Sequence, residues 1–70
     1  MKCFYCECKN LEITKSRLDT HDDYQNLVLV GKCKKCNKKS MSAIPIYENT
    51  IVINFDMNDK YNYEWANREV

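Results

Sequence analysis

The sequence predicts an all-β fold, in which a metal ion holds a ribbon of antiparallel strands together at one end. Three observations lead to this prediction. Two Cys-x-x-Cys pairs, Cys3/Cys6 and Cys33/Cys36, are separated by a long excursion. Much of the intervening and following sequence alternates in period two and carries β-branched residues, which is typical of strands. The chain has only 70 residues, and a core of that size needs a further stabilising element.

Each cysteine pair is expected to form a tight turn, or knuckle, that directs both sulfurs at one ion. A set of four thiolates is a closed tetrahedral site, typical of structural zinc. We therefore predict a zinc ribbon with rubredoxin-like knuckles and one structural Zn²⁺, bound by Cys3, Cys6, Cys33 and Cys36. Because a closed site leaves no position for a substrate, we expect a binding protein with no small-molecule substrate, and not an enzyme.

Iron is the alternative metal, since a rubredoxin-like electron carrier also uses two such knuckles. Iron knuckles favour Gly after the second cysteine, a position at which backbone donors approach sulfur. This chain has Glu7 and Asn37 there, and Glu adopts the left-handed conformation less readily than Asn. The sequence therefore favours zinc.

Two other side chains with donor atoms are expected to stay outside the metal site. Cys8 follows Cys6 too closely for both to bind comfortably, so we interpret it as a half-buried thiol. The alternatives for Cys8 are a substitute ligand for Cys6 or a reactive thiol beside basic residues. His21 lies in an acidic loop, residues 19–23, and is expected to be solvated.

The strands are expected in chain order. Residues 11–18 form the first, and residues 24–30 return antiparallel to it, which brings the second cysteine pair beside the first. Residues 41–47 form a third strand, which Pro45 places at an edge because proline has no N–H to donate. Residues 50–55 are the most strand-like run in the chain.

The C-terminal part is expected to be a β-hairpin, with residues 57–60 as its loop. Tyr61, Tyr63 and Trp65 then lie on one face of the last strand. The spacing of Tyr61 and Trp65 also fits a short helix, which is the alternative. One domain, residues 1–70, is expected, with the ribbon in residues 1–48 and the hairpin or tail in residues 49–70.

Charge is unevenly distributed, with nine Lys or Arg and five Asp or Glu in residues 1–46, against two and five in residues 47–70. Five lysines surround the second cysteine pair, and we call them the lysine cluster: Lys32, Lys34, Lys35, Lys38 and Lys39. The cluster either offsets the thiolate charge or contacts the phosphates of a nucleic acid. Without arginine it lacks the planar fork that reads guanine edges.

The C-terminal aromatic residues Tyr61, Tyr63 and Trp65 have two interpretations. They are either satellite core or an anchor for a protein partner, because Tyr and Trp contribute much of the binding energy at interfaces. The acidic residues around them suit a basic protein surface better than a nucleic acid.

The cellular location is expected to be a reducing cytoplasm. The cysteine count is odd, and the first pair begins at Cys3, which leaves no room for a signal peptide. The longest apolar run, residues 27–30, is far shorter than the roughly 20 residues that cross a bilayer.

Four segments resemble known regulators: Met-x-Cys-x-x-Cys at the start, Ser16-Arg17-Leu18, Cys33-x-x-Cys36-Asn37 and Tyr47-Glu48. Over residues 1–48 this pattern resembles the N-terminal zinc ribbon of bacterial repressors of ribonucleotide reductase genes. It is also similar to the small zinc-finger late-gene activators of temperate phages. The resemblance implies a ribbon that contacts DNA or RNA polymerase, although residues 26–32 replace the repressors' arginine run.

Together these observations predict a small zinc-binding regulatory or adaptor module in transcription control or phage–host regulation. Its expected target is nucleic acid, a protein such as RNA polymerase, or both. The alternatives are a purely protein-binding inhibitor of a host enzyme, of the kind that phages encode, and an iron electron carrier.

Overall fold

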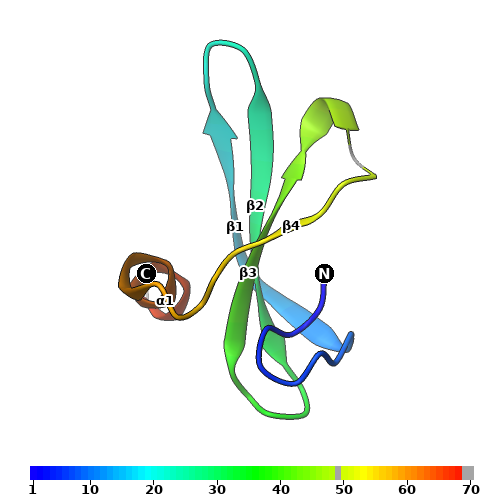
Figure 1. The fold of residues 1–70 in the computed structure, drawn as a ribbon, viewed down its shortest axis with the longest axis vertical. Coiled ribbons are helices and arrows are strands. Elements are labelled where there is room, and N and C mark those ends of the chain that lie inside the picture. The colour runs from blue at the N-terminus through cyan, green and yellow to red at the C-terminus, as the bar shows by residue number, and fades with distance from the viewer. Residues whose placement is uncertain (49, 69–70) are drawn as a thin grey trace.

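The structure is a computed structural model that describes residues 1–48 and 50–68. Within these residues, four antiparallel strands form one sheet in the order β1-β2-β3-β4, and one α-helix lies beside it (Figure 1). The elements are β1 (Leu11–Thr20), β2 (Gln25–Cys33), β3 (Lys39–Pro45), a 3-10 turn (Ile46–Glu48), β4 (Ile53–Asn54) and α1 (Lys60–Asn67). The predicted mostly-β fold is confirmed.

The register of the first two strands places the two knuckles together. Leu11, the first residue of β1, is paired with Cys33, the last residue of β2, and Thr20 is paired with Gln25 at the opposite end of this hairpin. Residues 3–10 therefore emerge beside the turn that joins β2 to β3. We call this end of the sheet, with residues 3–10 and the β2–β3 turn, the metal end. It lies at the bottom of Figure 1, and the β1–β2 turn lies at the top.

A β-bulge at Thr14 changes which side chains of β1 face the helix. Ile13 is paired with Gly31 and Lys15 with Val30, so one extra residue of β1 is inserted between them. The Thr14 hydroxyl donates to the carbonyl oxygen of Val30 at 3.4 Å. Because side chains alternate along a strand, the bulge puts Lys15 on the same face as buried Val30.

The fourth strand is shorter than predicted. Only Ile53 and Asn54 pair with β3, at Ala43 and Ser42, whereas the sequence predicted a strand over residues 50–55. The Asn54 side chain also accepts a hydrogen bond from the Ser42 hydroxyl at 2.9 Å. Before this strand, the N–H of Ile51 donates to the carbonyl of Glu48 at 3.1 Å and is therefore used in a turn and not in the ladder.

The predicted C-terminal hairpin is wrong, and the alternative of a short helix is confirmed. Residues 60–67 form α1, which begins after Asp59. The Asp59 carboxylate accepts the backbone N–H of Asn62 at 3.1 Å and so supplies the N-cap that a helix requires. In the predicted hairpin, Asp59 belongs to the loop. Neither α1 nor any other helical segment in the described ranges is long and apolar enough to cross a membrane.

The core lies between one face of the sheet and α1. Its buried side chains come from β2, β3, the segment before the helix and the helix itself: Val28, Val30, Met41, Ala43, Met57 and Ala66. Tyr5, Phe55 and Trp65 pack against this group. Tyr5 belongs to the first knuckle, so the metal end and the core share a boundary.

Candidate metal centre

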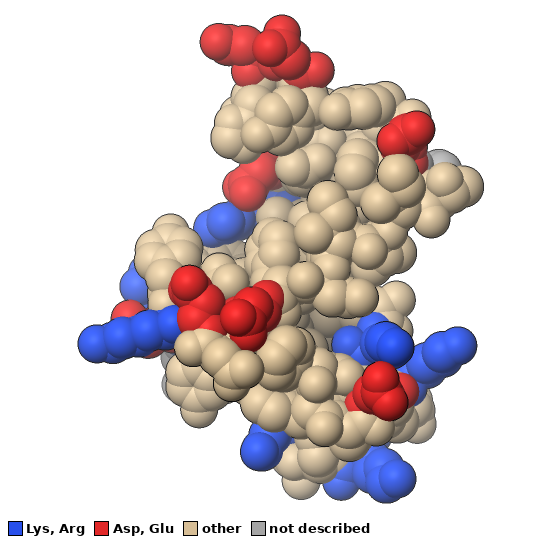
Figure 2. Space-filling view, viewed as in Figure 1, with Lys and Arg blue, Asp and Glu red and all other residues tan. Residues whose placement is uncertain are grey.

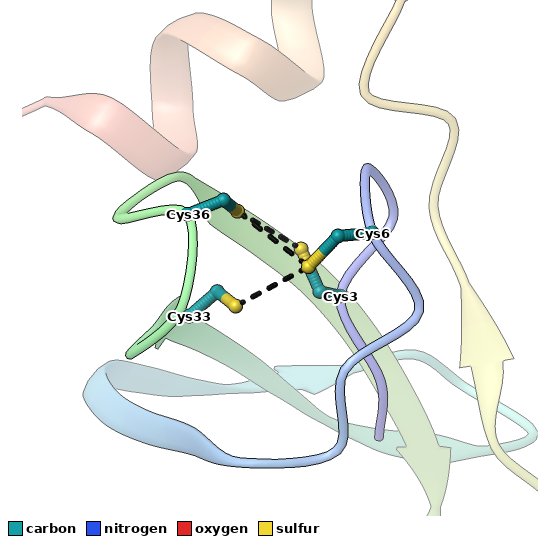
Figure 3. Close-up of side chains that lie close together, drawn as sticks. All are labelled: Cys3, Cys6, Cys33 and Cys36. Atoms are coloured by element: carbon teal, nitrogen blue, oxygen red, sulfur yellow. Dashed lines mark hydrogen bonds between the residues drawn. The ribbon is translucent and has the colours of Figure 1, made fainter.

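Four sulfur atoms converge at the metal end of the sheet. Those of Cys3, Cys6, Cys33 and Cys36 all lie within 4.8 Å of one another, and their side chains point toward one another from the N-terminal loop and the β2–β3 turn (Figure 3). Sulfur–sulfur contacts between the two pairs measure 3.5, 3.6 and 3.8 Å. Tetrahedral coordination with metal–sulfur bonds of about 2.3 Å places sulfurs about 3.8 Å apart. The four cysteines therefore fit a single metal ion.

The two knuckles, residues 3–8 and 33–38, have the same backbone hydrogen bonds. In the first, the N–H of Glu7 donates to the carbonyl of Cys3 at 3.0 Å, and the N–H of Cys3 donates to the carbonyl of Cys8 at 2.8 Å. In the second, Asn37 donates to Cys33 and Cys33 to Lys38, both at 2.9 Å. Equal cysteine spacing has produced equal loops.

The residue after the second cysteine of each knuckle has a left-handed backbone. The φ angle is 60° at Glu7 and 62° at Asn37, and no other non-glycine residue of the described chain has a positive φ. Both non-glycine residues thus adopt the conformation for which iron knuckles favour Gly. The absence of Gly at these two positions therefore does not prevent the left-handed backbone, and the backbone conformation does not distinguish zinc from iron.

Backbone N–H groups surround the sulfurs in the same pattern in both knuckles. The first cysteine of each pair receives the N–H groups of the residues two and three positions later, and the second cysteine receives that of the residue two positions later. Lys35 N lies 3.4 Å from the sulfur of Cys33 in one of these contacts. Such donors favour the thiolate form, which is the form that binds metal.

These donors divide the four thiols into two kinds. The N–H of Cys36 is the main cause that lowers the pKa of Cys33 to about 6. Burial raises the pKa of Cys3, but the backbone donors outweigh it and the net direction is downward. At Cys6 and Cys36 the backbone donor lowers the pKa, yet burial and the neighbouring thiols outweigh it, and the pKa of Cys6 rises to about 12. In each knuckle the pKa of the first cysteine is thus lowered and the pKa of the second is raised.

Two backbone contacts attach the knuckles to the sheet. The N–H of Phe4 donates to the hydroxyl oxygen of buried Ser40 at 2.9 Å, and the N–H of Lys34 donates to the carbonyl of Asn10 at 3.1 Å. A Cβ atom at Gly31 would lie 3.0 Å from Met1 and 3.2 Å from Leu11, so this glycine lets the N-terminal segment approach β2 closely. Sequence reasoning missed Ser40, because nothing in its local pattern signals a knuckle partner.

The other two donor side chains lie outside the sulfur cluster. Cys8 corresponds to Lys38 in the second knuckle and closes its loop through its carbonyl, while its sulfur lies 3.4 Å from Asn10 N. His21 lies in the β1–β2 turn, at the opposite end of the sheet, where its ring stacks on Tyr24 with centroids 4.5 Å apart.

The lysine cluster lies at the metal end. Four of its lysines are exposed and Lys39 is half-buried. Among the described residues, none of the five forms an ion pair with an acidic side chain. The exposed Asp22 and Asp23 lie in the β1–β2 turn, and Figure 2 shows acidic atoms at that end and mostly basic atoms, with some acidic ones among them, at the metal end. Glu12 is one acidic residue of the metal end, where it is paired with Lys32 across β1 and β2. The molecule is therefore electrically polarised along its long axis.

The three C-terminal aromatic residues do not share one face, because they belong to a helix. Tyr61 is 70% exposed and Tyr63 is 51% exposed. Trp65 packs against the core, and two cations lie over its ring, with Lys15 Nζ 4.4 Å and Arg17 Cζ 4.2 Å from the ring centroid.

Lys15 is a residue whose role sequence reasoning missed. Its ammonium group donates to the carbonyl oxygens of Trp65 and Arg68, at 2.5 and 3.0 Å, and so binds the C-terminal end of α1, where a cation is favourable. Burial, with Lys39, Arg68 and Arg17 nearby, lowers the pKa of Lys15. Lys15 and Arg17 are two positions apart, which indicates that they share one face of β1. The bulge that turns this face toward Trp65 has no signal in the sequence.

Comparison with protein-family models, with curated proteins and with solved structures gave no match to this chain. The assignment therefore depends on the sulfur cluster itself. The convergence of four cysteines from two equivalent knuckles identifies the chain as a small module with a candidate metal centre.

Proposed function

We propose that this protein is a zinc-binding regulatory module, in transcription control or phage–host regulation, that binds nucleic-acid backbones through its lysine cluster. The observation that carries the proposal is the electrical polarity of the molecule. Five lysines without acidic partners among the described residues lie at the metal end, and Asp22 and Asp23 lie at the opposite end. A polyanion would attract the first end and repel the second, which orients the module before contact.

Zinc is the proposed ion, because four thiolates in a closed set are its usual structural site. Bound there by Cys3, Cys6, Cys33 and Cys36, it would supply the cross-link that joins the two knuckles. Four thiolates and one dication leave a local charge of about −2. The five lysines of the cluster carry more positive charge than is needed to offset it. Iron is distinguished by metal analysis and by colour, because ferric thiolate absorbs visible light and zinc thiolate does not.

A salt series tests the nucleic-acid proposal. If all five lysines contact phosphates of a DNA duplex, the logarithm of affinity falls against the logarithm of salt concentration with a slope of about −4 to −5. The double variant Lys34→Ala/Lys35→Ala is expected to lower that slope by about 2 units and to leave the metal site intact, because both side chains are exposed. The hydrogen bonds of Lys34 to Asn10 and of Lys35 to the Cys33 sulfur are made by backbone N–H groups, which alanine keeps. Lys60→Ala is the matched control, since Lys60 is exposed on α1 near Glu64. No binding at low salt would exclude the proposal.

A protein partner is the second candidate, and a different observation favours it. Several large apolar side chains are exposed on the strands and turns away from the lysine cluster: Leu18, Leu27, Ile46, Tyr47, Ile51, Val52 and Ile53. Two of them, Leu18 and Leu27, are directly paired across β1 and β2, and neighbouring exposed apolar side chains are characteristic of interaction sites. Capture of a specific protein that is lost with Leu18→Ser/Leu27→Ser, but kept with Lys34→Ala/Lys35→Ala, would support an inhibitor or adaptor in place of a nucleic-acid binder.

A further inference from the structure

A pocket of about 250 Å³ lies between the second knuckle and α1. Its walls combine two aromatic rings, two ammonium groups and two amides, from Tyr5, Asn37, Lys38, Lys39, Tyr63 and Asn67. We call it the knuckle–helix pocket. Among residues 1–48 and 50–68, no acidic side chain lines it, although α1 carries Glu64 and the segment before it carries Asp56 and Asp59. The helix thus turns a neutral aromatic face toward the lysines and keeps its acidic residues elsewhere.

We propose that the knuckle–helix pocket binds one unpaired nucleotide, so that the protein prefers single-stranded nucleic acid to a duplex. This inference rests on the proposed nucleic-acid function and assigns its substrate class. A base offers a flat ring and hydrogen-bonding edges, and its phosphate offers a negative charge. The pocket supplies a partner for each of these.

The two tyrosines have different parts in this arrangement. Tyr5 packs against the core, and Lys38 Nζ lies over its ring, 4.6 Å from the ring centroid, so Tyr5 is the core-anchored ring of the pocket and attracts the ammonium group. Tyr63 is 51% exposed, and its ring is available for a base to stack on. Single-strand binding proteins combine these two features, a stacking platform and a positively charged track.

The amides and lysines would recognise the remaining parts of the nucleotide. Asn37 lies in the knuckle and Asn67 on the last turn of α1, and primary amides can both donate to and accept from base edges. The pocket is smaller than the roughly 300–1,000 Å³ of a typical small-molecule site, so it suits one nucleotide and not a larger cofactor. In a duplex the bases are stacked internally and cannot enter it.

The test measures binding of the zinc-loaded full chain to two labelled probes by fluorescence anisotropy. The probes are an oligothymidine strand of about 12 nucleotides, which is within the usual site size, and a duplex of the same length. Tyr63→Ala is expected to weaken single-strand binding about 5- to 150-fold, the range given by 1–3 kcal/mol per stacked base, and to leave duplex binding unchanged. Tyr63→Phe is expected to restore the affinity, because it keeps the ring.

Tyr61→Ala is the matched control, since Tyr61 lies on the same helix but outside the pocket. It is expected to bind both probes as the unaltered protein does. Free thymidine monophosphate offers the same base and phosphate, and we expect it to compete more than 100-fold more weakly than the strand, because it lacks the flanking phosphates that the other lysines contact. Competition at equal concentration would assign the pocket to a free nucleotide and overturn the preference for a strand.

Failure of this inference and failure of the proposed function give different results. If Tyr63→Ala affects both probes equally or neither, while the lysine variants still lower the salt slope, the pocket assignment is wrong and the backbone-binding function stands. If neither probe binds the unaltered protein at low salt, both are wrong. Capture of a protein that depends on Tyr63, without binding of either probe, would assign the pocket to a peptide.

Discussion

The two knuckles share one backbone and differ in almost everything that their side chains do. Both close through equivalent hydrogen bonds and both have a left-handed residue after the second cysteine. Between the cysteines, however, the first carries Phe4 and Tyr5 and the second carries Lys34 and Lys35. Tyr5 packs against the core, whereas the two lysines are exposed.

This difference shows which part of a knuckle sets its shape and which part sets its role. The loops share their cysteine spacing and their backbone hydrogen bonds, whereas the residues between the cysteines differ in what they contact. In this chain the first knuckle serves packing and the second presents charge. The two loops of the candidate metal centre therefore differ in their surroundings, because one contributes an aromatic ring to the core and the other exposes two lysines to solvent.

The largest expected effect comes from breaking the ligand set. Cys3→Ser and Cys33→Ser, each at the first position of its knuckle, are expected to unfold the protein to the same extent. The reason is that structural zinc contributes about 10–16 kcal/mol, which exceeds the roughly 3–5 kcal/mol available from a core of this size. Circular dichroism during chelation and for both variants measures this.

Cys8→Ser is the matched control for that experiment, because the Cys8 sulfur lies outside the cluster. It should change the free energy of unfolding by less than about 0.5 kcal/mol. A chelated protein that kept its dispersed amide spectrum would contradict the prediction.

A smaller loss of stability is expected from the residues between the cysteines, and it should differ between the two knuckles. Tyr5→Ala is expected to lower the free energy of unfolding by about 2 kcal/mol, somewhat less than the 3–5 kcal/mol of fully buried aromatic residues, because Tyr5 is only half-buried. Lys35→Ala, at the equivalent position, should change it by less than about 0.5 kcal/mol. Urea unfolding of the zinc-loaded variants measures both, and equal losses would mean that the two loops are packed alike.

The smallest effect concerns the left-handed positions. A non-glycine residue there costs about 1–2 kcal/mol, and the greater chain entropy of Gly offsets about 0.5–1 kcal/mol of that cost. Glu7→Gly is therefore expected to raise the free energy of unfolding by about 0.5 kcal/mol, and Asn37→Gly to leave it nearly unchanged, because Asn tolerates this conformation better. Thermal unfolding of the two variants compares them.

Glu7→Gln controls for charge in this comparison, since Glu7 lies 3.6 Å from Lys2 in an exposed ion pair. Such pairs contribute little, so Glu7→Gln should match the unaltered protein. A gain as large as that of Glu7→Gly would assign the effect to charge and not to the backbone.

The ligand set and the first three strands could be predicted from the sequence, because each depends on a local pattern. Two equal Cys-x-x-Cys spacings imply two equal loops, and the alternation in residues 11–18 corresponds to β1, which continues to Thr20. The second and third strands, predicted over residues 24–30 and 41–47, run from Gln25 to Cys33 and from Lys39 to Pro45.

The tail could not be settled in the same way, because Tyr61, Tyr63 and Trp65 fit both period two and a helical spacing. The N-cap residue Asp59 was the deciding signal, and a hairpin loop uses the same residue types. The position of Trp65 depended on the bulge at Thr14, which orients Lys15 and Arg17. A contact such as that between Lys15 and Trp65, which lie 50 positions apart, cannot be recognised from strand alternation or from helical spacing.

The cation pair around Trp65 has a practical consequence. This side chain is the only indole in the chain, and it lies where α1 meets β1, not at the sulfur cluster. Its emission therefore reports whether the C-terminal helix is docked, independently of thiolate absorption, which reports whether the ion is held. One sample thus carries two optical signals, and the order in which they disappear on heating shows which end of the molecule opens first.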